Sequence, residues 1–190
     1  MNILSVIGVL GVFASAALAG ELPENIYGFN ALDIDGNDVS MSKYKGKVVL
    51  IVNVATEWGL TDQNYAEMND LYDQFSPDLA ILAFPCNQFG GQEPGNNSQI
   101  KHFVREEKGG QFDLFSKIEV NGDNAIPLFK YLKEKQQGWF TKRITWNFTK
   151  FLVNQSGVPV QRFYPHYSPA RIAPYIRHLL CSGVENCKYT

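Results

Sequence analysis

The hydrophobic pattern in the middle of the chain predicts a strand, a helix and a second strand, in that order. Residues 47–55 and 79–85 are short apolar runs, as expected of buried strands in a sheet covered on both faces, and the first run is rich in β-branched side chains. The apolar residues between the two runs recur at the spacing of a helix: Tyr65, Met68, Tyr72 and Phe75. Parallel strands joined by a right-handed helical crossover are the nucleus of an α/β fold.

Alternating and turn-forming patterns on either side of this unit predict two hairpins. Residues 29–39 read as two short strands around the turn-forming sequence Asp-Gly-Asn-Asp. Later, residues 144–153 are predicted to pair with residues 158–163 across a polar turn, Asn-Gln-Ser-Gly, at residues 154–157. The second hairpin adds antiparallel strands to the sheet.

Three further helices complete the predicted elements. One is expected at residues 98–106, one from Pro127 to Leu132, and one near the C-terminus, where Pro174 favours a start close to that residue. Helices that alternate with strands and are followed by an antiparallel hairpin describe a mixed central β-sheet flanked by helices. This order fits a thioredoxin-like α/β fold.

Length and charge limit the number of domains and the kind of partner. A chain of 190 residues, 45% hydrophobic and 19% charged, can bury a sizeable core in one domain. The net charge of -2, without long runs of like charge, gives no electrostatic reason to expect nucleic acid or an anionic membrane surface as partner. We therefore expect the substrate to be a small molecule, or a lipid presented from solution.

The first 19 residues have the pattern of a cleaved signal peptide. Residues 3–19 are apolar and uncharged, and they end in Ala-Leu-Ala, the A-x-A form of a signal-peptidase site, before Gly20. A short membrane anchor is the alternative, but the run is shorter than the roughly 20 apolar residues that a spanning helix needs. The sequence predicts a secreted protein whose mature domain spans residues 20–190.

Export allows cysteines to pair, because the extracellular compartment is oxidising. Cys181 and Cys187 lie close together in a polar tail, where they either close a small disulfide loop or are two unrelated thiols. Cys86 ends an apolar run, so it is expected to be a buried, unreactive thiol and is not assigned as a nucleophile.

Residues 53–61 leave a buried strand and enter a helix, a place suited to a reactive group. A thiolate or selenolate there would face the positive end of the helix dipole and free backbone N–H groups, which favour its ionised form.

Three motifs in order resemble those of the glutathione peroxidases. They are Asn-Val-Ala-x-x-Trp-Gly-x-Thr at residues 53–61, Phe-Pro-Cys-Asn-Gln-Phe-Gly-Gly-Gln-Glu-Pro at residues 84–94, and Trp-Asn-Phe-Thr-Lys-Phe at residues 146–151. In the family a selenocysteine or cysteine acts with a glutamine, a tryptophan and an asparagine. The resemblance places these roles at Trp58, Gln92, Trp146 and Asn147.

Taken singly, each of these side chains has an ordinary structural explanation: Trp146 could be a core residue, Asn147 a polar residue at a strand end, and Gln92 a loop residue. Together and at this spacing, we interpret them as N–H donors that hold a selenolate or thiolate and a departing oxygen anion. The resemblance implies hydrogen peroxide and lipid hydroperoxides as substrates and glutathione as co-substrate, with no bound cofactor or metal.

Trp58 departs from the family at the position of the attacking atom. An indole cannot attack a peroxide or form a mixed disulfide, so the chain as written is expected to be inactive as a peroxidase. Either Trp58 stands for a selenocysteine, whose UGA codon differs from the tryptophan codon by one base, or the protein is a catalytically dead binding or structural module. We favour the selenocysteine explanation, because the other positions of the site are intact.

Further departures bear on the reductant and on assembly. Thioredoxin-dependent relatives carry a resolving cysteine where this chain has Arg105, which favours glutathione or another external thiol. The segment 123–146 is short, resembling the monomeric phospholipid hydroperoxide type, so we expect a monomer with an open face; that type usually has a lysine at the position of Leu60.

An ordinary thiol-disulfide oxidoreductase is disfavoured, because no Cys-x-x-Cys occurs. Glycosylation sequons occur at Asn96, Asn147 and Asn154, of which Asn154 is the favoured acceptor.

Overall fold

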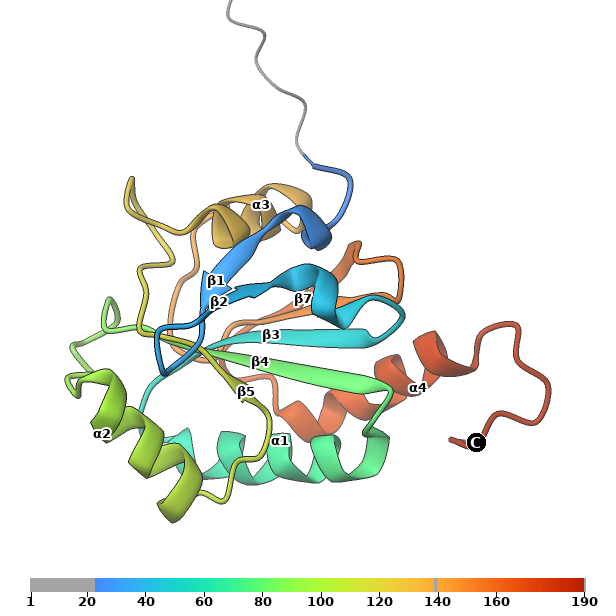
Figure 1. The fold of residues 1–190 in the computed structure, drawn as a ribbon, viewed down its shortest axis with the longest axis horizontal. Coiled ribbons are helices and arrows are strands. Elements are labelled where there is room, and N and C mark those ends of the chain that lie inside the picture. Colours follow the sequence, from blue (N-terminus) through green and yellow to red (C-terminus); the bar gives the residue numbers. More distant parts are fainter. Residues whose placement is uncertain (1–22, 139, 190) are drawn as a thin grey trace, which may run out of the picture.

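A five-stranded mixed sheet forms the centre of the molecule (Figure 1). A computed structural model describes residues 23–138 and 140–189. The strand order is β5-β4-β3-β6-β7, with β3 (Val48–Val54) and β4 (Leu79–Pro85) parallel at the centre. The remaining strands are β5 (Asp113–Leu114), parallel to β4, and the antiparallel pair β6 (Lys150–Val153) and β7 (Pro159–Phe163). The predicted mixed sheet is confirmed.

All seven residues of β3 and all seven of β4 are buried, which explains why both read as unbroken apolar runs. Successive side chains of β3 enter different layers of the core. Val48, Leu50, Val52 and Val54 pack with α1 and α4 on one face, whereas Val49 and Ile51 pack with α3 on the other.

Helices cover both faces of the sheet. The helices α1 (Thr61–Phe75) and α4 (Ala173–Cys181) lie below the sheet in the view of Figure 1, and α3 (Pro127–Lys135) lies above it. The small hairpin of β1 (Asn30–Leu32) and β2 (Asp38–Ser40) lies on the α3 side, with the short 3-10 helices η1 (Ile26–Gly28) and η2 (Met41–Tyr44) beside it.

Two predicted helices have more complex forms than a single α-helix. The one predicted at residues 98–106 consists of α2 (Asn97–His102), which begins in a capping box at Asn96, followed by a π-helical turn, η3 (Phe103–Glu107). The C-terminal one is preceded by a 3-10 turn, η4 (Pro169–Ile172). Pro174 lies in the first turn of α4, where a missing N–H has no cost, so the predicted start is confirmed.

The predicted strand at residues 144–153 is wrong in its first half. The strand β6 begins only at Lys150, and residues 144–149 form a loop in which Phe148 has a left-handed φ of 55°. An extended strand excludes that conformation. The hairpin turn itself is confirmed, with Asn154 accepting the N–H groups of Ser156 and Val158 at 3.0 Å each.

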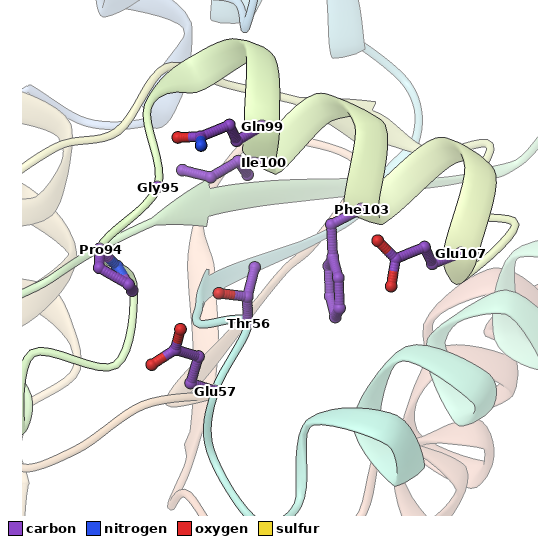
Figure 2. A pocket seen from close by; sticks show the side chains of 8 residues that line it. All are labelled: Thr56, Glu57, Pro94, Gly95, Gln99, Ile100, Phe103 and Glu107. Carbon is purple, nitrogen blue, oxygen red and sulfur yellow. The ribbon is translucent and has the colours of Figure 1, made fainter.

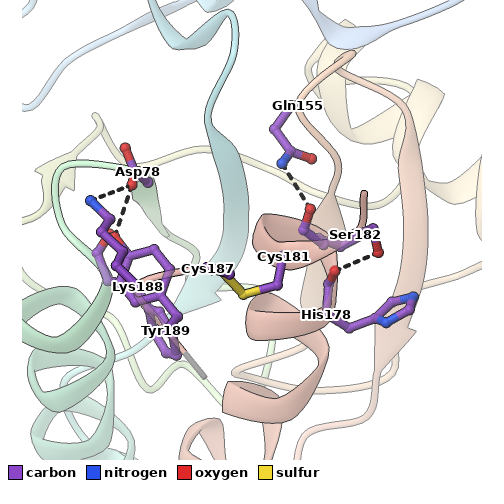
Figure 3. The surroundings of a disulfide bond; sticks show 10 residues. Asp78, Gln155, His178, Cys181, Ser182, Cys187, Lys188 and Tyr189 are labelled. Atoms are coloured by element: carbon purple, nitrogen blue, oxygen red, sulfur yellow. Dashed lines mark hydrogen bonds and ion pairs between the residues drawn. A yellow bond between two sulfur atoms is a disulfide. The ribbon is translucent and has the colours of Figure 1, made fainter. Parts of the chain in front are cut away.

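A disulfide joins Cys181 to Cys187 and closes the C-terminal tail (Figure 3). Beyond it, the hydroxyl of Tyr189 donates to Asp78 Oδ2 at 2.9 Å, and Lys188 pairs with the same carboxylate at 2.8 Å. The tail is thereby attached to the end of α1 and the start of β4. Cys86 is fully buried and unpaired, and burial raises the pKa of its thiol, as expected of an unreactive cysteine.

Residues 1–19, the predicted signal peptide, lie outside the described residues. Among the residues that are described, no helix is long and apolar enough to cross a membrane.

The disulfide is expected to stabilise the fold modestly, because its cysteines are only six residues apart and close a small loop. Replacing both Cys181 and Cys187 by Ser should lower the free energy of unfolding by about 2 kcal/mol. Urea denaturation of the oxidised parent, the reduced parent and the double variant measures this. The reduced parent should match the double variant, and identical midpoints for all three would contradict a stabilising role.

Candidate active site

The loop between β3 and α1 carries position 58 and is held by one threonine. Thr61, the first residue of α1, is almost fully buried. Its hydroxyl donates to the Ala55 carbonyl at 2.9 Å and accepts the Trp58 N–H at 3.0 Å, while its own N–H donates to the Trp58 carbonyl at 2.9 Å. These bonds fold the loop over the N-terminal end of the helix, where the helix dipole favours an anion.

The indole of Trp58 is half-buried and contacts two other loops. It stacks on Phe148, with ring centroids 5.7 Å apart, and meets His166 edge-on at 5.5 Å. Position 58 therefore lies between the loop that precedes β6 and the loop that follows β7.

The loop after β4 brings Gln92 to the same place. Gly90 and Gly91 both adopt left-handed φ angles, 65° and 66°, a conformation that side chains with a Cβ rarely take. The turn that they form allows the Gln92 carbonyl to accept the Glu57 N–H at 3.1 Å. The residue that precedes position 58 is thus hydrogen-bonded to Gln92.

The loop before β6 supplies the other two predicted residues. Asn147 is fully buried, and its Nδ2 donates to Gln92 Oε1 at 2.7 Å. Trp146 is 39% exposed. A Cβ added to Gly90 would lie 3.5 Å from Gln92 Cγ and 3.6 Å from Trp146 Cζ2, so these two side chains converge over that glycine.

The structure thus brings Gln92, Trp146 and Asn147 together beside the loop of Trp58. Because Gln92 Oε1 accepts from Asn147, the group that Gln92 has left to offer is the donor Nε2. With the indole N–H of Trp146, the site presents hydrogen-bond donors suited to an anion. Asn147 also begins one of the three glycosylation sequons, and its side chain is fully buried.

Asn53 is a residue of this region that sequence reasoning missed. It is fully buried in β3, and its Nδ2 donates to the Trp146 carbonyl at 3.2 Å while its Oδ1 accepts the Thr149 N–H at 3.0 Å. Its backbone carbonyl accepts the Phe148 N–H at 2.7 Å. Asn53 therefore fixes the loop that carries Trp146 and Asn147. An amide inside an apolar strand was the signal that could have revealed it.

Glu93 is the second missed residue. Its side chain is fully buried next to Gln92, and neither carboxylate oxygen makes a hydrogen bond of good geometry among the described residues. Burial raises the pKa of Glu93 to about 7, although the nearby Thr56 and the charge of Lys117 lower it in part. A titrating carboxyl group therefore lies beneath the loop of position 58.

A pocket of about 380 Å³ opens on the other side of this loop, facing α2 and η3 (Figure 2). Its lining residues are Thr56, Glu57, Pro94, Gly95, Gln99, Ile100, Phe103 and Glu107. None of Gln92, Trp146 or Asn147 lines it. Arg105, at the position of a resolving cysteine in thioredoxin-dependent relatives, donates to the Gly110 carbonyl instead.

The class of protein follows first from the fold. A thiol:disulfide interchange protein of the thioredoxin family from Chlorobium tepidum superposes with a TM-score of 0.61 over 80% of this chain and 92% of its own, at 16% identity. The fold is therefore thioredoxin-like, with three loops meeting at one edge of the sheet.

The chain belongs to the glutathione peroxidase family, whose sequence pattern matches residues 26–133. A glutathione peroxidase of Schistosoma mansoni is 52% identical over 157 residues, 82% of this chain and 93% of the relative. A probable phospholipid hydroperoxide glutathione peroxidase of Mesembryanthemum crystallinum is 50% identical over 166 residues, covering 87% and 98%. The crystal structure of T. cruzi GPX1 matches with a TM-score of 0.66 at 34% identity, covering 82% of this chain and 95% of that one.

The buried carboxyl of Glu93 predicts a pH-dependent stability. Between about pH 4.3, the pKa of an exposed glutamate, and pH 7 the folded protein retains a proton that the unfolded chain releases. The stability linked to this proton is fully present below about pH 4 and is lost as the pH rises through 7. The free energy of unfolding of Glu93→Gln, taken relative to that of the parent, should therefore rise between pH 5 and pH 8, by at most about 3 kcal/mol.

Urea denaturation of both chains at pH 5 and pH 8 tests this, because comparing them at each pH cancels every other titration. Glu107→Gln, at an exposed carboxylate on the pocket wall, is the matched control, and its free energy of unfolding relative to the parent should be the same at both pH values. An equal change for Glu93→Gln at both pH values would contradict the raised pKa.

Proposed function

We propose that the native protein reduces hydrogen peroxide and organic or lipid hydroperoxides with glutathione, through a selenocysteine or cysteine at position 58. The observation that carries this is the convergence of Gln92, Trp146 and Asn147 beside that position, joined by the 2.7 Å bond between the two amides. Membership of the glutathione peroxidase family supports the reaction class.

The reaction balances as three steps. A selenolate or thiolate at position 58 attacks one peroxide oxygen, the O–O bond breaks, and the departing oxygen takes up a proton as alcohol or water. The resulting selenenic or sulfenic acid reacts with one glutathione, releasing water, and a second glutathione releases the disulfide and restores the nucleophile. Gln92 and Trp146 would stabilise the nucleophile and the departing oxygen by donating hydrogen bonds.

Trp58 itself cannot perform the first step, so the chain as written would be inactive. Its indole lies against Phe148 and His166 while the bond between Gln92 and Asn147 remains formed. An intact set of donors supports a selenocysteine at this position rather than a site that has decayed. A dead binding module is the second candidate, favoured by the fit of the indole between its two ring partners.

The codon for residue 58 separates these candidates. UGA, with a selenocysteine insertion element in the 3′ untranslated region, would establish the native enzyme, and UGG would support the dead module.

Bulky lipid hydroperoxides are among the proposed substrates because the site is accessible from solvent: the indole of Trp146 is 39% exposed. The description of several relatives as probable phospholipid hydroperoxide glutathione peroxidases supports the same class. Glutathione is the proposed reductant because Arg105 stands where a resolving cysteine would be needed, and Cys86, the free thiol in the described part of the chain, is buried.

We also propose that the mature protein is exported and monomeric. The apolar leader that ends at residues 17–19 supports export, as does a disulfide between Cys181 and Cys187. The short segment 123–146 supports the monomer. Material from the native source should begin at Gly20 by N-terminal sequencing and show the mass of one chain by light scattering; an intact Met1 or a stable tetramer would contradict these proposals.

Substituting Trp58→Cys should create glutathione-dependent reduction of hydrogen peroxide and lipid hydroperoxides. Selenocysteine at this position should react faster, because a selenol is ionised at neutral pH, where a thiol with a pKa of about 8.5 is mostly protonated. Adding Gln92→Ala or Asn147→Ala should slow peroxide attack by roughly tenfold or more, since each removes a hydrogen bond from the set of donors.

Stopped-flow measurement of thiol oxidation by peroxide gives the rate of attack directly. Gln111→Ala, at an exposed glutamine away from the three loops, is the matched control and should leave the rate unchanged. If the folded Trp58→Cys protein shows no peroxide-dependent oxidation of its new thiol, the dead-module candidate replaces the peroxidase.

A further inference from the structure

The loop that follows β7 places a histidine against position 58. The ring of His166 meets the indole of Trp58 edge-on at 5.5 Å, and Phe148 stacks on the same indole at 5.7 Å. The imidazole is exposed to solvent and makes no hydrogen bond within the described part of the chain. A smaller side chain at position 58 would leave a space that this imidazole borders.

A buried lysine fixes the backbone on both sides of His166. Lys150, the first residue of β6, is fully buried, and its Nζ donates to the carbonyls of Pro165 at 3.0 Å and Tyr167 at 2.8 Å. Burying an amine is costly unless its donors are satisfied. Both of these hydrogen bonds are made to the two residues that flank His166, so Lys150 holds that segment at its position.

The same loop is anchored from α1. Glu67 accepts the hydroxyl of Ser168 and the N–H of Ala170, the latter at 2.9 Å. Arg171 lies over the ring of Tyr167, with 4.5 Å between its Cζ and the ring centroid. The charged groups that surround this loop are therefore Lys150 from β6, Glu67 from α1 and Arg171 from η4.

We propose that His166 is a further residue of the peroxide-reducing site, donating a hydrogen bond to the selenolate or thiolate at position 58, and that Lys150 positions it. This inference rests on the proposed function. A cationic or N–H donor beside a thiolate favours its charged form, and the donors of Gln92 and Trp146 approach from other loops.

Lys150 can keep the loop in place throughout the neutral range. Burial lowers the pKa of its amine to about 7, with Glu67 opposing the shift. The charged form has three N–H donors and the neutral form has two, and the loop requires only two. Titration of Lys150 near neutral pH therefore leaves both carbonyls bonded.

The first experiment keeps Trp58 and uses its fluorescence as the reporter. In a Trp139→Phe, Trp146→Phe background, the fluorescence of Trp58 should fall through one inflection as the pH is lowered, because a protonated imidazole quenches a neighbouring indole. His166→Gln should abolish this inflection, and His102→Gln, at an exposed histidine on α2, should leave it intact. An inflection that persists in His166→Gln would overturn the placement of the imidazole.

The second experiment measures the thiol of Trp58→Cys by its rate of alkylation with iodoacetamide against pH. Adding His166→Gln should raise the thiol pKa by about one unit, and so slow alkylation at pH 6.5 by about tenfold. Lys150→Met should shift the same pKa in the same direction, because the carbonyls of Pro165 and Tyr167 lose their bonds to Lys150. His102→Gln is again the control and should change neither quantity.

The outcomes separate this inference from the proposed function. An unchanged thiol pKa in His166→Gln, with peroxide reduction intact, overturns the role of His166 and leaves the peroxidase standing. A raised thiol pKa in a protein that never reduces peroxide supports the role of His166 and rejects the peroxidase. Because the side chain of His166 is exposed, we expect the His166→Gln variant to fold like the parent.

Discussion

The side chain of Asn53 lies inside a strand whose other six residues are valine, leucine or isoleucine, and both of its ends bond to the backbone of residues 146–149. An amide buried there without partners would cost several kcal/mol, on the order of two lost hydrogen bonds. The loop must therefore follow the amide, and Phe148 takes up a left-handed φ to do so. This constraint turns Asn147 toward Gln92, so the rest of the site depends on it.

The direction of the strands explains why residues far apart in sequence meet. The carboxyl ends of the parallel strands β3 and β4 lie at one edge of the sheet, and the antiparallel β6 begins at that same edge. Loops at this edge of an α/β sheet are where such folds place their ligands. Position 58, Gln92 and Asn147 leave or enter the sheet at these three ends, and each loop is bonded to another through backbone or amide groups.

The sequence was sufficient to predict β3, β4 and α1, because a strand buried on both faces leaves an unbroken apolar run and a helix with one apolar face leaves a helical periodicity. It could not show that residues 144–149 form a loop, because the φ of Phe148 is imposed by Asn53, almost a hundred residues away. Nor could it decide the pairing of Cys181 with Cys187, which depends on a Cα separation of 5.3 Å. Gln92, Trp146 and Asn147 were found through family resemblance, whereas Glu93 was missed because its burial is a tertiary property.

None of the bonds that shape the site uses the side chain of residue 58. The loop is held through the backbone of Glu57 and Trp58, by Gln92 and by Thr61. An evolving lineage could therefore exchange the attacking atom at this position by a single-base change without rebuilding the architecture around it. Loss and recovery of the chemistry would then leave the hydrogen bonds of the three loops in place, so that the residues around position 58 need not change together with it.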